Sequence, residues 1–96
     1  MRFEWDENKR MINLDKHGLD FLDAHEIFND TVVTMDDNRF DYGEQRFFTL
    51  GMIFGRVVAL SHTDRNKSIR VISLRKANKY EQQRYIEEIG NRLGKD

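Results

Sequence analysis

The chain has 96 residues, of which 39% are hydrophobic and 34% are charged, and it contains no cysteine. This length supports one modest core and predicts a single domain over residues 1–96, while the lack of cysteine excludes disulfides and thiolate metal sites and favours a reducing cytoplasm. The net charge is −1, but residues 1–48 hold 6 Lys and Arg against 12 Asp and Glu, whereas residues 49–96 hold 10 against 5.

The N-terminal third predicts a short strand and two helices. Residues 3–5 are apolar enough for a strand, and Asp6 is a suitable cap for a helix that runs to His17 and stops at Gly18. Asp20 then caps a second helix with apolar residues at helical spacing, namely Phe21, Ala24, Ile27 and Phe28. We expect a helical hairpin whose apolar stripes face the sheet that follows.

The middle of the chain predicts four strands separated by turn-rich segments. Their expected ranges are 31–35, 45–54, 57–63 and 69–74. A last helix begins at Asn78, which forms a predicted capping box with Glu81, and its apolar face carries Tyr85, Ile86, Ile89 and Leu93. The order β-α-α-β-β-β-β-α indicates an α+β fold with a largely antiparallel sheet.

Cations gather where the last strand passes into the last helix. Arg75 and Lys76 follow the last strand and Lys79 lies just after Asn78, next to N–H groups that favour an anion. A second cationic corner contains Arg65, Lys67 and Arg70. Alternation along residues 69–74 places Arg70 and Arg75 on opposite faces of the sheet, so a joint site needs a bulge or a twist. The charges favour phosphate binding, although complementary pairing of the two halves within the fold explains them equally well.

Three further residues and one acidic segment are candidates for a role in a site. Glu81 either caps the last helix or takes part in chemistry, and Tyr85 packs its ring on the sheet whether or not its hydroxyl acts. His62, inside a strand next to a polar turn, is the histidine with the best chance of facing a site. The acidic run between Asp36 and Glu44 lacks the spacing of a calcium loop and is interpreted as turn chemistry or an acidic surface.

The ordered set of motifs along nearly the whole chain resembles the BrnT family of toxins. The first half carries F-E-W-D, then Lys, Asn, K-H-G and F-x-x-A-x-x-x-F, at Phe3–Asp6, Lys9, Asn13, Lys16–Gly18, Phe21, Ala24 and Phe28. The second half carries GEQRF, T-x-R, IR-x-IS-x-R-x-A and a helical Glu and Tyr, at Gly43–Phe47, Thr63, Arg65, Ile69–Ser73, Arg75, Ala77, Glu81 and Tyr85. Three positions depart from the family pattern, namely His62, Leu74 and Asn78.

The resemblance implies a RelE-like fold with an N-terminal strand, two helices, a four-stranded sheet and a C-terminal helix. It also implies a type II toxin–antitoxin system in which the toxin is an endoribonuclease that inhibits translation. A BrnA-type ribbon-helix-helix antitoxin is the implied partner, so contact with DNA is indirect, through the antitoxin. We expect a hetero-oligomer with that antitoxin, with a toxin dimer inside it as a further option, and no membrane partner.

Enzymes of this kind cleave RNA by attack of the 2′-hydroxyl on the adjacent phosphate, and positive charge stabilises the transition state. No cofactor or metal is expected. We assign the scissile phosphate to Arg65 and Arg75, and acid–base chemistry to Glu81 or Tyr85 with His62 as the alternative. The other RNA-binding cations are expected to be Lys67, Arg70, Lys76, Lys79 and Arg84.

Two hypotheses from another class remain open on the sequence alone. In the first, the chain is an RNA- or partner-binding module without catalysis. In the second, it is mainly a co-repressor that acts with its antitoxin. In a binding module, alanine changes at Lys67, Lys76 and Lys79 would weaken RNA binding and its salt dependence, but no cleavage would appear. Only RNA cleavage by the purified protein separates the enzyme from the binding module.

Overall fold

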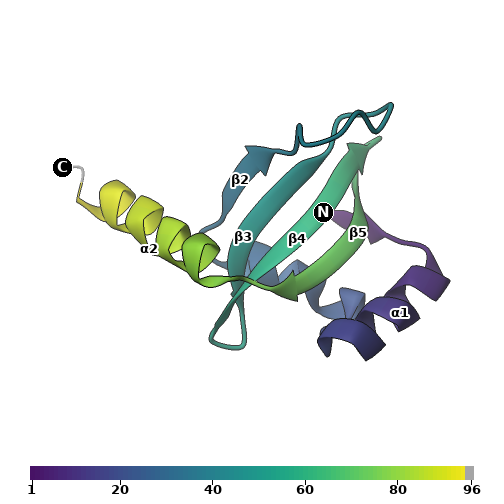
Figure 1. Cartoon of the computed structure of the whole chain (residues 1–96), viewed down its shortest axis with the longest axis horizontal. Helices are drawn as coiled ribbons and strands as arrows, with labels where there is room; N and C mark the ends of the chain where they lie inside the picture. The colour runs from purple at the N-terminus through teal and green to yellow at the C-terminus, as the bar shows by residue number, and fades with distance from the viewer. Residues whose placement is uncertain (95–96) are drawn as a thin grey trace.

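A computed structural model describes residues 1–94, which form a twisted sheet with helices on both faces (Figure 1). Figure 1 shows η1 behind the sheet, α1 beside β5, and α2 extending away from the sheet beyond β3. The α+β class is confirmed. The elements are β1 (Arg2–Glu4), α1 (Glu7–His17), η1 (Phe21–Asn29), β2 (Val33–Asp36), β3 (Phe47–Ile53), β4 (Arg56–Arg65), β5 (Ser68–Lys76) and α2 (Lys79–Leu93).

The sheet has five strands, not the predicted four, in the order β1-β5-β4-β3-β2. The four strands from β2 to β5 are antiparallel neighbours, as predicted. β1 adds a fifth strand parallel to β5, with Phe3 opposite Ile69. This short strand is stabilised by its half-buried Phe3, which packs on Phe28 with ring centroids 5.8 Å apart.

The second predicted helix, η1, is a 3₁₀-helix over nine residues. Its fully buried side chains are Phe21, Ala24 and Ile27, and this spacing of three places them on one line of a helix with three residues per turn. η1 lies very close to β3, since a Cβ at Gly51 would overlap the Ile27 side chain. Gly51 thus permits the close approach of η1 to the sheet.

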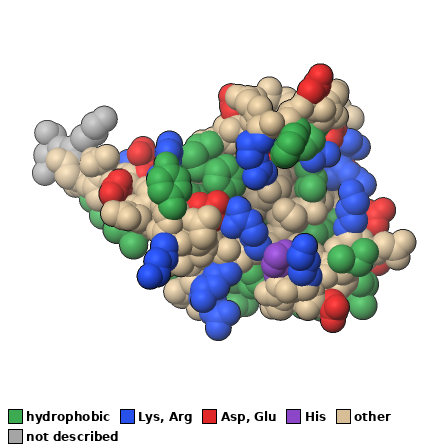
Figure 2. Space-filling model, in the orientation of Figure 1, with side chains coloured by type: hydrophobic (Ala, Val, Ile, Leu, Met, Phe, Trp, Pro, Cys, Tyr) green, Lys and Arg blue, Asp and Glu red, His purple; other side chains and the backbone are tan. Residues whose placement is uncertain are grey.

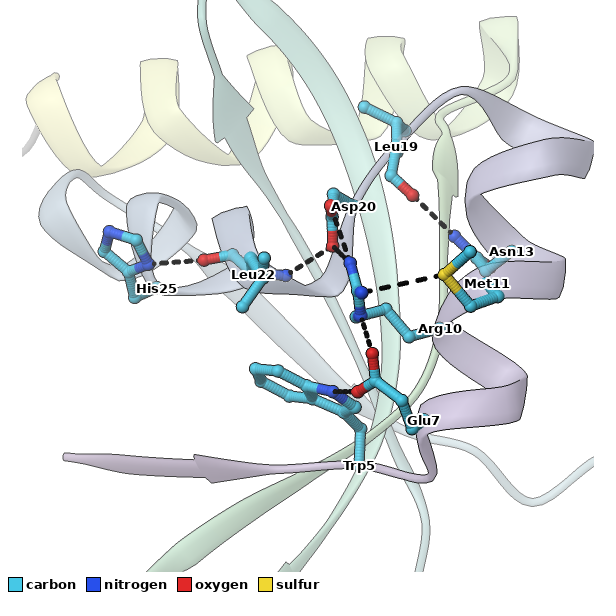
Figure 3. Close-up of polar contacts among 9 residues, drawn as sticks. All are labelled: Trp5, Glu7, Arg10, Met11, Asn13, Leu19, Asp20, Leu22 and His25. Atoms are coloured by element: carbon cyan, nitrogen blue, oxygen red, sulfur yellow. Dashed lines mark hydrogen bonds and ion pairs between the residues drawn. The ribbon is translucent and has the colours of Figure 1, made fainter.

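Polar contacts fix the junction between α1 and η1 (Figure 3). Both predicted caps are confirmed, because Asp6 accepts from the Lys9 N–H and Asp20 accepts from the Leu22 N–H. Arg10 connects the two helices, with its Nη1 2.9 and 3.0 Å from the Asp20 carboxylate oxygens. The hairpin expected from the sequence is therefore held by a guanidinium as well as by its apolar stripe.

A bulge in β5 changes which residues share a face of the sheet. Ser61 of β4 pairs with Ser73, whereas the next residue, His62, pairs with Val71. Ile72 is therefore extra, and Val71 and Leu74 both lie in the core against η1. Arg70 and Arg75 consequently lie on the same face, opposite α1 and η1, and the prediction from simple alternation was wrong.

The edge of β5 beyond the bulge is closed by the buried side chain of Asn13. Its amide accepts from the Leu74 N–H at 3.1 Å and donates to the Leu74 carbonyl at 2.7 Å, as a neighbouring strand would. The same Nδ2 group donates to the Leu19 carbonyl at 3.0 Å. Asn13 thereby anchors α1 to the backbone immediately before Arg75.

Helix α2 packs on the sheet mainly through Tyr85 and Ile89. Tyr85 is buried and Ile89 is half-buried, whereas Ile86 and Leu93 are 64% and 77% exposed, so the predicted apolar face is only partly used. The predicted capping box between Asn78 and Glu81 is present. Within residues 1–94 no helix is long and apolar enough to cross a membrane.

Candidate active site

A cleft of about 370 Å³ opens on the sheet face opposite α1 and η1. Its floor is formed by strand residues, namely Phe48, Leu50, Ser61 and Ser73. One wall is the connection between β2 and β3, and the other is the first two turns of α2. Figure 2 shows this face hollowed over the middle of the sheet, with Lys and Arg side chains gathered around the hollow.

Arg75 and Glu81 form a bidentate ion pair at the edge of this cleft. The two Arg75 nitrogens lie 2.7 and 2.9 Å from the two Glu81 oxygens. Glu81 is buried, and the guanidinium of Arg75 holds its pKa below the ordinary glutamate value. The same pairing raises the pKa of Arg75, which stays charged. The structure thus brings a permanent cation and an ionised carboxylate to one position in the cleft.

Glu81 also occupies the start of α2, where we expected a bound phosphate. Its carboxylate accepts from the Asn78 N–H at 3.0 Å, and the Asn78 side chain accepts from the Glu81 N–H at 2.8 Å. The two interpretations of Glu81 are therefore compatible, since one carboxylate caps the helix and faces Arg75. An anion at this position would interact with Arg75 rather than with the capped helix end.

The cations beyond Arg75 are divided between the cleft and the surface around it. Arg84 lines the cleft beside Tyr80, whose hydroxyl is 3.5 Å from Arg84 Nη1. Lys76 and Lys79 are exposed and do not line it. Lys76 pairs with Val58, which belongs to the core under η1, so the Lys76 side chain lies on the η1 face of the sheet, opposite the cleft.

The second cationic corner lies at the other end of β4 and β5. Arg65 pairs with Ser68, whereas Arg75 pairs with Ala59. Residues 59 and 65 are six positions apart along β4, which corresponds to roughly 20 Å. Arg65 Nη2 is 3.0 Å from Glu44 Oε1, and Arg70 Nη1 is 3.8 Å from Glu4 Oε1. The two corners share a face but do not converge on one point.

Lys67 belongs to the tight turn between β4 and β5 and is exposed. Its φ of 70° and the φ of 46° at Asn66 give both turn residues the left-handed conformation of a two-residue hairpin. The predicted turn at this position is confirmed. Its lysine lies beside Arg65 in sequence, at the far end of the sheet from the cleft.

Tyr85 and His62 lie outside the cleft. The Tyr85 hydroxyl donates to the Thr31 carbonyl at 2.8 Å, and the ring is buried under α2. His62 points to the opposite face of the sheet, where it stacks on Phe47, and its Nε2 is 2.8 Å from Thr49 Oγ1. Neither side chain reaches the cleft from these positions.

The buried position of His62 predicts a pH-dependent stability. Burial lowers its pKa below the ordinary histidine value, although Asp64 opposes this shift. Because the unfolded chain takes up a proton more readily, the free energy of unfolding should fall as the pH drops below about 6.5. In His62→Phe, the difference in denaturation midpoint between pH 7.5 and pH 5.5 should shrink. An unchanged pH difference in that variant would contradict this assignment.

Sequence analysis missed Arg39, which lies in the wall formed by the connection between β2 and β3. Its Nε and Nη2 are 2.9 and 3.0 Å from the carboxylate of Asp37, which is buried. In the acidic run, Asp37 therefore stabilises a turn by accepting from the Arg39 N–H, which is the first of the two interpretations given for this run. The signal for Arg39 was a lone cation in that run, but only the fold places it across from Arg75.

Among residues 1–94 no three His, Asp or Glu side chains form a metal-binding group.

Comparison with known protein families agrees with the motifs in both halves of the chain. Residues 5–81 match the family model described as "Ribonuclease toxin, BrnT, of type II toxin-antitoxin system". No curated protein matches the chain. The match covers most of the chain, including Arg39, Arg75 and Glu81 of the cleft. The chain therefore belongs to the BrnT family of ribonuclease toxins from type II toxin–antitoxin systems.

Proposed function

We propose that this chain is a metal-independent endoribonuclease whose active site is the cleft between α2 and the connection of β2 to β3. The observation that carries the proposal is Arg75, a guanidinium fixed by a buried carboxylate and facing an open cleft. A donor held in place before the reaction stabilises developing charge at little cost in reorganisation. Here the charge is that of a pentavalent phosphate in the transition state.

The proposed reaction uses the RNA itself as the nucleophile. The 2′-oxygen attacks the adjacent phosphorus, Glu81 accepts the 2′-hydroxyl proton, and the bond from phosphorus to the 5′-oxygen breaks. The leaving 5′-oxygen takes a proton from solvent, and the products carry a 2′,3′-cyclic phosphate and a 5′-hydroxyl. Arg84 lines the same cleft and contacts a neighbouring phosphate.

The cations outside the cleft extend the RNA-binding surface. Arg65 and Arg70 lie on the same sheet face as Arg75 and contact phosphates further along the strand. Arg65 and Arg75 are therefore not proposed to bind the same phosphate, because roughly 20 Å separates their positions on β4 and β5. Lys67, Lys76 and Lys79 are exposed and add long-range attraction.

A BrnA-type antitoxin is the proposed partner, and DNA contact runs through that antitoxin. Acidic residues that cover the basic cleft would neutralise the toxin, since they compete with RNA phosphates for the same guanidinium groups. The cytoplasm, where translation takes place, is the proposed location of the complex.

Cleavage in the presence of excess EDTA is the deciding experiment. The purified chain, freed of any antitoxin, should cleave single-stranded RNA at an unchanged rate and leave 2′,3′-cyclic phosphate ends. The same RNA with 2′-deoxyribose at the mapped cleavage sites should stay intact, because it lacks the nucleophile. Loss of cleavage in EDTA with recovery in Mg²⁺ would contradict the metal-free mechanism. Binding of RNA without any cleavage would favour the binding module or co-repressor.

A further inference from the structure

Two arginines face the cleft from opposite walls, and each is held by a buried carboxylate. Arg75 is paired with Glu81 on the α2 side, and Arg39 is paired with Asp37 on the side of the connection between β2 and β3. Glu81 is only 8% exposed and Asp37 only 7%, so each arginine is held by a buried carboxylate. Both pairs are bidentate, through Nη1 and Nη2 in Arg75 and through Nε and Nη2 in Arg39, and each leaves guanidinium N–H groups available to an anion in the cleft.

Asp37 determines where Arg39 lies. Its carboxylate accepts from the Arg39 backbone N–H at 3.3 Å and from two guanidinium nitrogens, and the Tyr42 hydroxyl adds a contact at 3.4 Å. The Asp37 N–H also donates to the Arg46 carbonyl at 2.8 Å, which fixes the base of the connection. These three hydrogen bonds from Arg39 to Asp37 leave the Arg39 side chain little freedom to turn away from the cleft.

Arg39 nevertheless keeps donors available to a ligand. A guanidinium has five N–H donors, and the pair with Asp37 uses only Nε and Nη2. Within residues 1–94, Nη1 makes no hydrogen bond to the protein, and the Arg39 side chain is 67% exposed. A phosphate oxygen in the cleft is the kind of acceptor that this free edge fits.

The charge of Arg39 acts on the same place as that of Arg75. Glu81 has its pKa lowered first by Arg75 and, to a smaller extent, by Arg39. The pKa of Arg75 is raised by Glu81, while Arg39 opposes this rise as a like charge. Two guanidinium groups that repel each other across an open cleft gain most from an anion placed between them.

We propose that Arg39 and Arg75 form a two-arginine clamp on one RNA phosphate, and that Asp37 is the positioning residue of Arg39. The inference rests on the proposed ribonuclease site and names a second phosphate ligand within it. The competing explanation is that the pair of Arg39 and Asp37 only fixes the connection between β2 and β3. That explanation predicts a change in stability without any change in RNA affinity.

The test measures binding of the full chain to a mixed-sequence pool of single-stranded RNA carrying 2′-O-methyl on every ribose, which blocks cleavage. Arg39→Ala should weaken binding about 10- to 100-fold, as expected for a lost hydrogen bond to a charged group. The slope of log affinity against log salt should fall by about 0.7, because one phosphate contact on a single strand is lost. Arg92→Ala, which removes an arginine near the end of α2 outside the cleft, is the matched control and should bind normally.

Two further variants test how Arg39 acts. Arg39→Lys keeps the charge and should recover most of the salt slope but little of the affinity, since a lysine lacks the guanidinium fork. Asp37→Asn should weaken binding in the parent chain and have no further effect in the Arg39→Ala background, since it acts through Arg39. Additive losses in the double variant would overturn the positioning role of Asp37.

Unchanged affinity and salt slope in Arg39→Ala would overturn the clamp. Arg75→Ala, measured in parallel for binding and cleavage, separates this result from failure of the whole site. If Arg75→Ala is defective and Arg39→Ala is normal, the active site stands and Arg39 is excluded from it. If both variants bind and cleave normally, the proposed active site is rejected together with the clamp.

Discussion

Replacing Arg75 with alanine should lower the rate of RNA cleavage by about 10²- to 10³-fold, as expected when one preorganised donor to a transition state is removed. The structure gives two reasons for so large an effect. The guanidinium is aligned by two bonds to Glu81, and its backbone position is fixed because Asn13 pairs with Leu74 immediately before it. The measurement is the single-turnover rate on RNA at saturating protein, which separates chemistry from binding.

The control for this prediction is Arg65→Ala, which removes a cation from the same face at the far end of the sheet. It should weaken binding and its salt dependence while leaving the saturated rate nearly unchanged, because it contacts a different phosphate. Arg75→Lys should recover only part of the lost rate, since an ammonium cannot pair bidentately. Full activity of Arg75→Ala, seen as normal cleavage and normal growth arrest, would remove Arg75 from the reaction.

Local signals in the sequence predicted most of the fold. Each cap and turn has a short-range physical cause, such as the aspartate side chains that accept from the first N–H groups of α1 and η1. The antiparallel strands followed from β-branched runs interrupted by turn residues, and their pairing from short connections. The 3₁₀ form of η1 did not follow from these signals, because the spacing of Phe21, Ala24 and Ile27 fits one face of an α-helix as well.

The features that the sequence did not reveal depend on contacts between distant segments. The bulge at Ile72 is specified by the register between β4 and β5, and it alone decides that Arg70 and Arg75 share a face. The parallel pairing of β1 with β5 depends on packing of Phe3 against η1. Similarly, the exposure of Ile86 and Leu93 depends on how α2 is turned against the sheet, because Tyr85 and Ile89 of the same helix pack on it while Ile86 does not.

The candidate site shows the same division between local and distant information. The pair of Arg75 and Glu81 was within reach of sequence reasoning because a strand end and a helix cap lie six residues apart. Arg39 was not, because 36 residues separate it from Arg75 and only the sheet order brings the connection of β2 and β3 opposite α2. His62 was considered for the site from its neighbours in sequence, yet its face of the sheet is determined by pairing with Phe47.

Glu81 is the residue for which two roles can now be separated by substitution. Glu81→Gln keeps an oxygen that accepts from the Asn78 N–H and from Arg75, because glutamine also serves in a capping box. What it loses is a carboxylate able to take the 2′-hydroxyl proton. If Glu81 is the general base, the cleavage rate should fall by about 10²- to 10⁴-fold with a much smaller change in the free energy of unfolding.

The matched control is Asn78→Ala, which removes the cap and leaves the carboxylate. It should lower the free energy of unfolding by about 1 kcal/mol and leave most of the cleavage rate. Because Arg75 lowers the pKa of Glu81, the base stays ionised at mildly acidic pH, and the acid limb of the rate profile should lie at a lower pH than an ordinary glutamate base would give. Normal cleavage by Glu81→Gln would show that the carboxylate only orients Arg75 and caps α2, and the proton would then have to go to solvent.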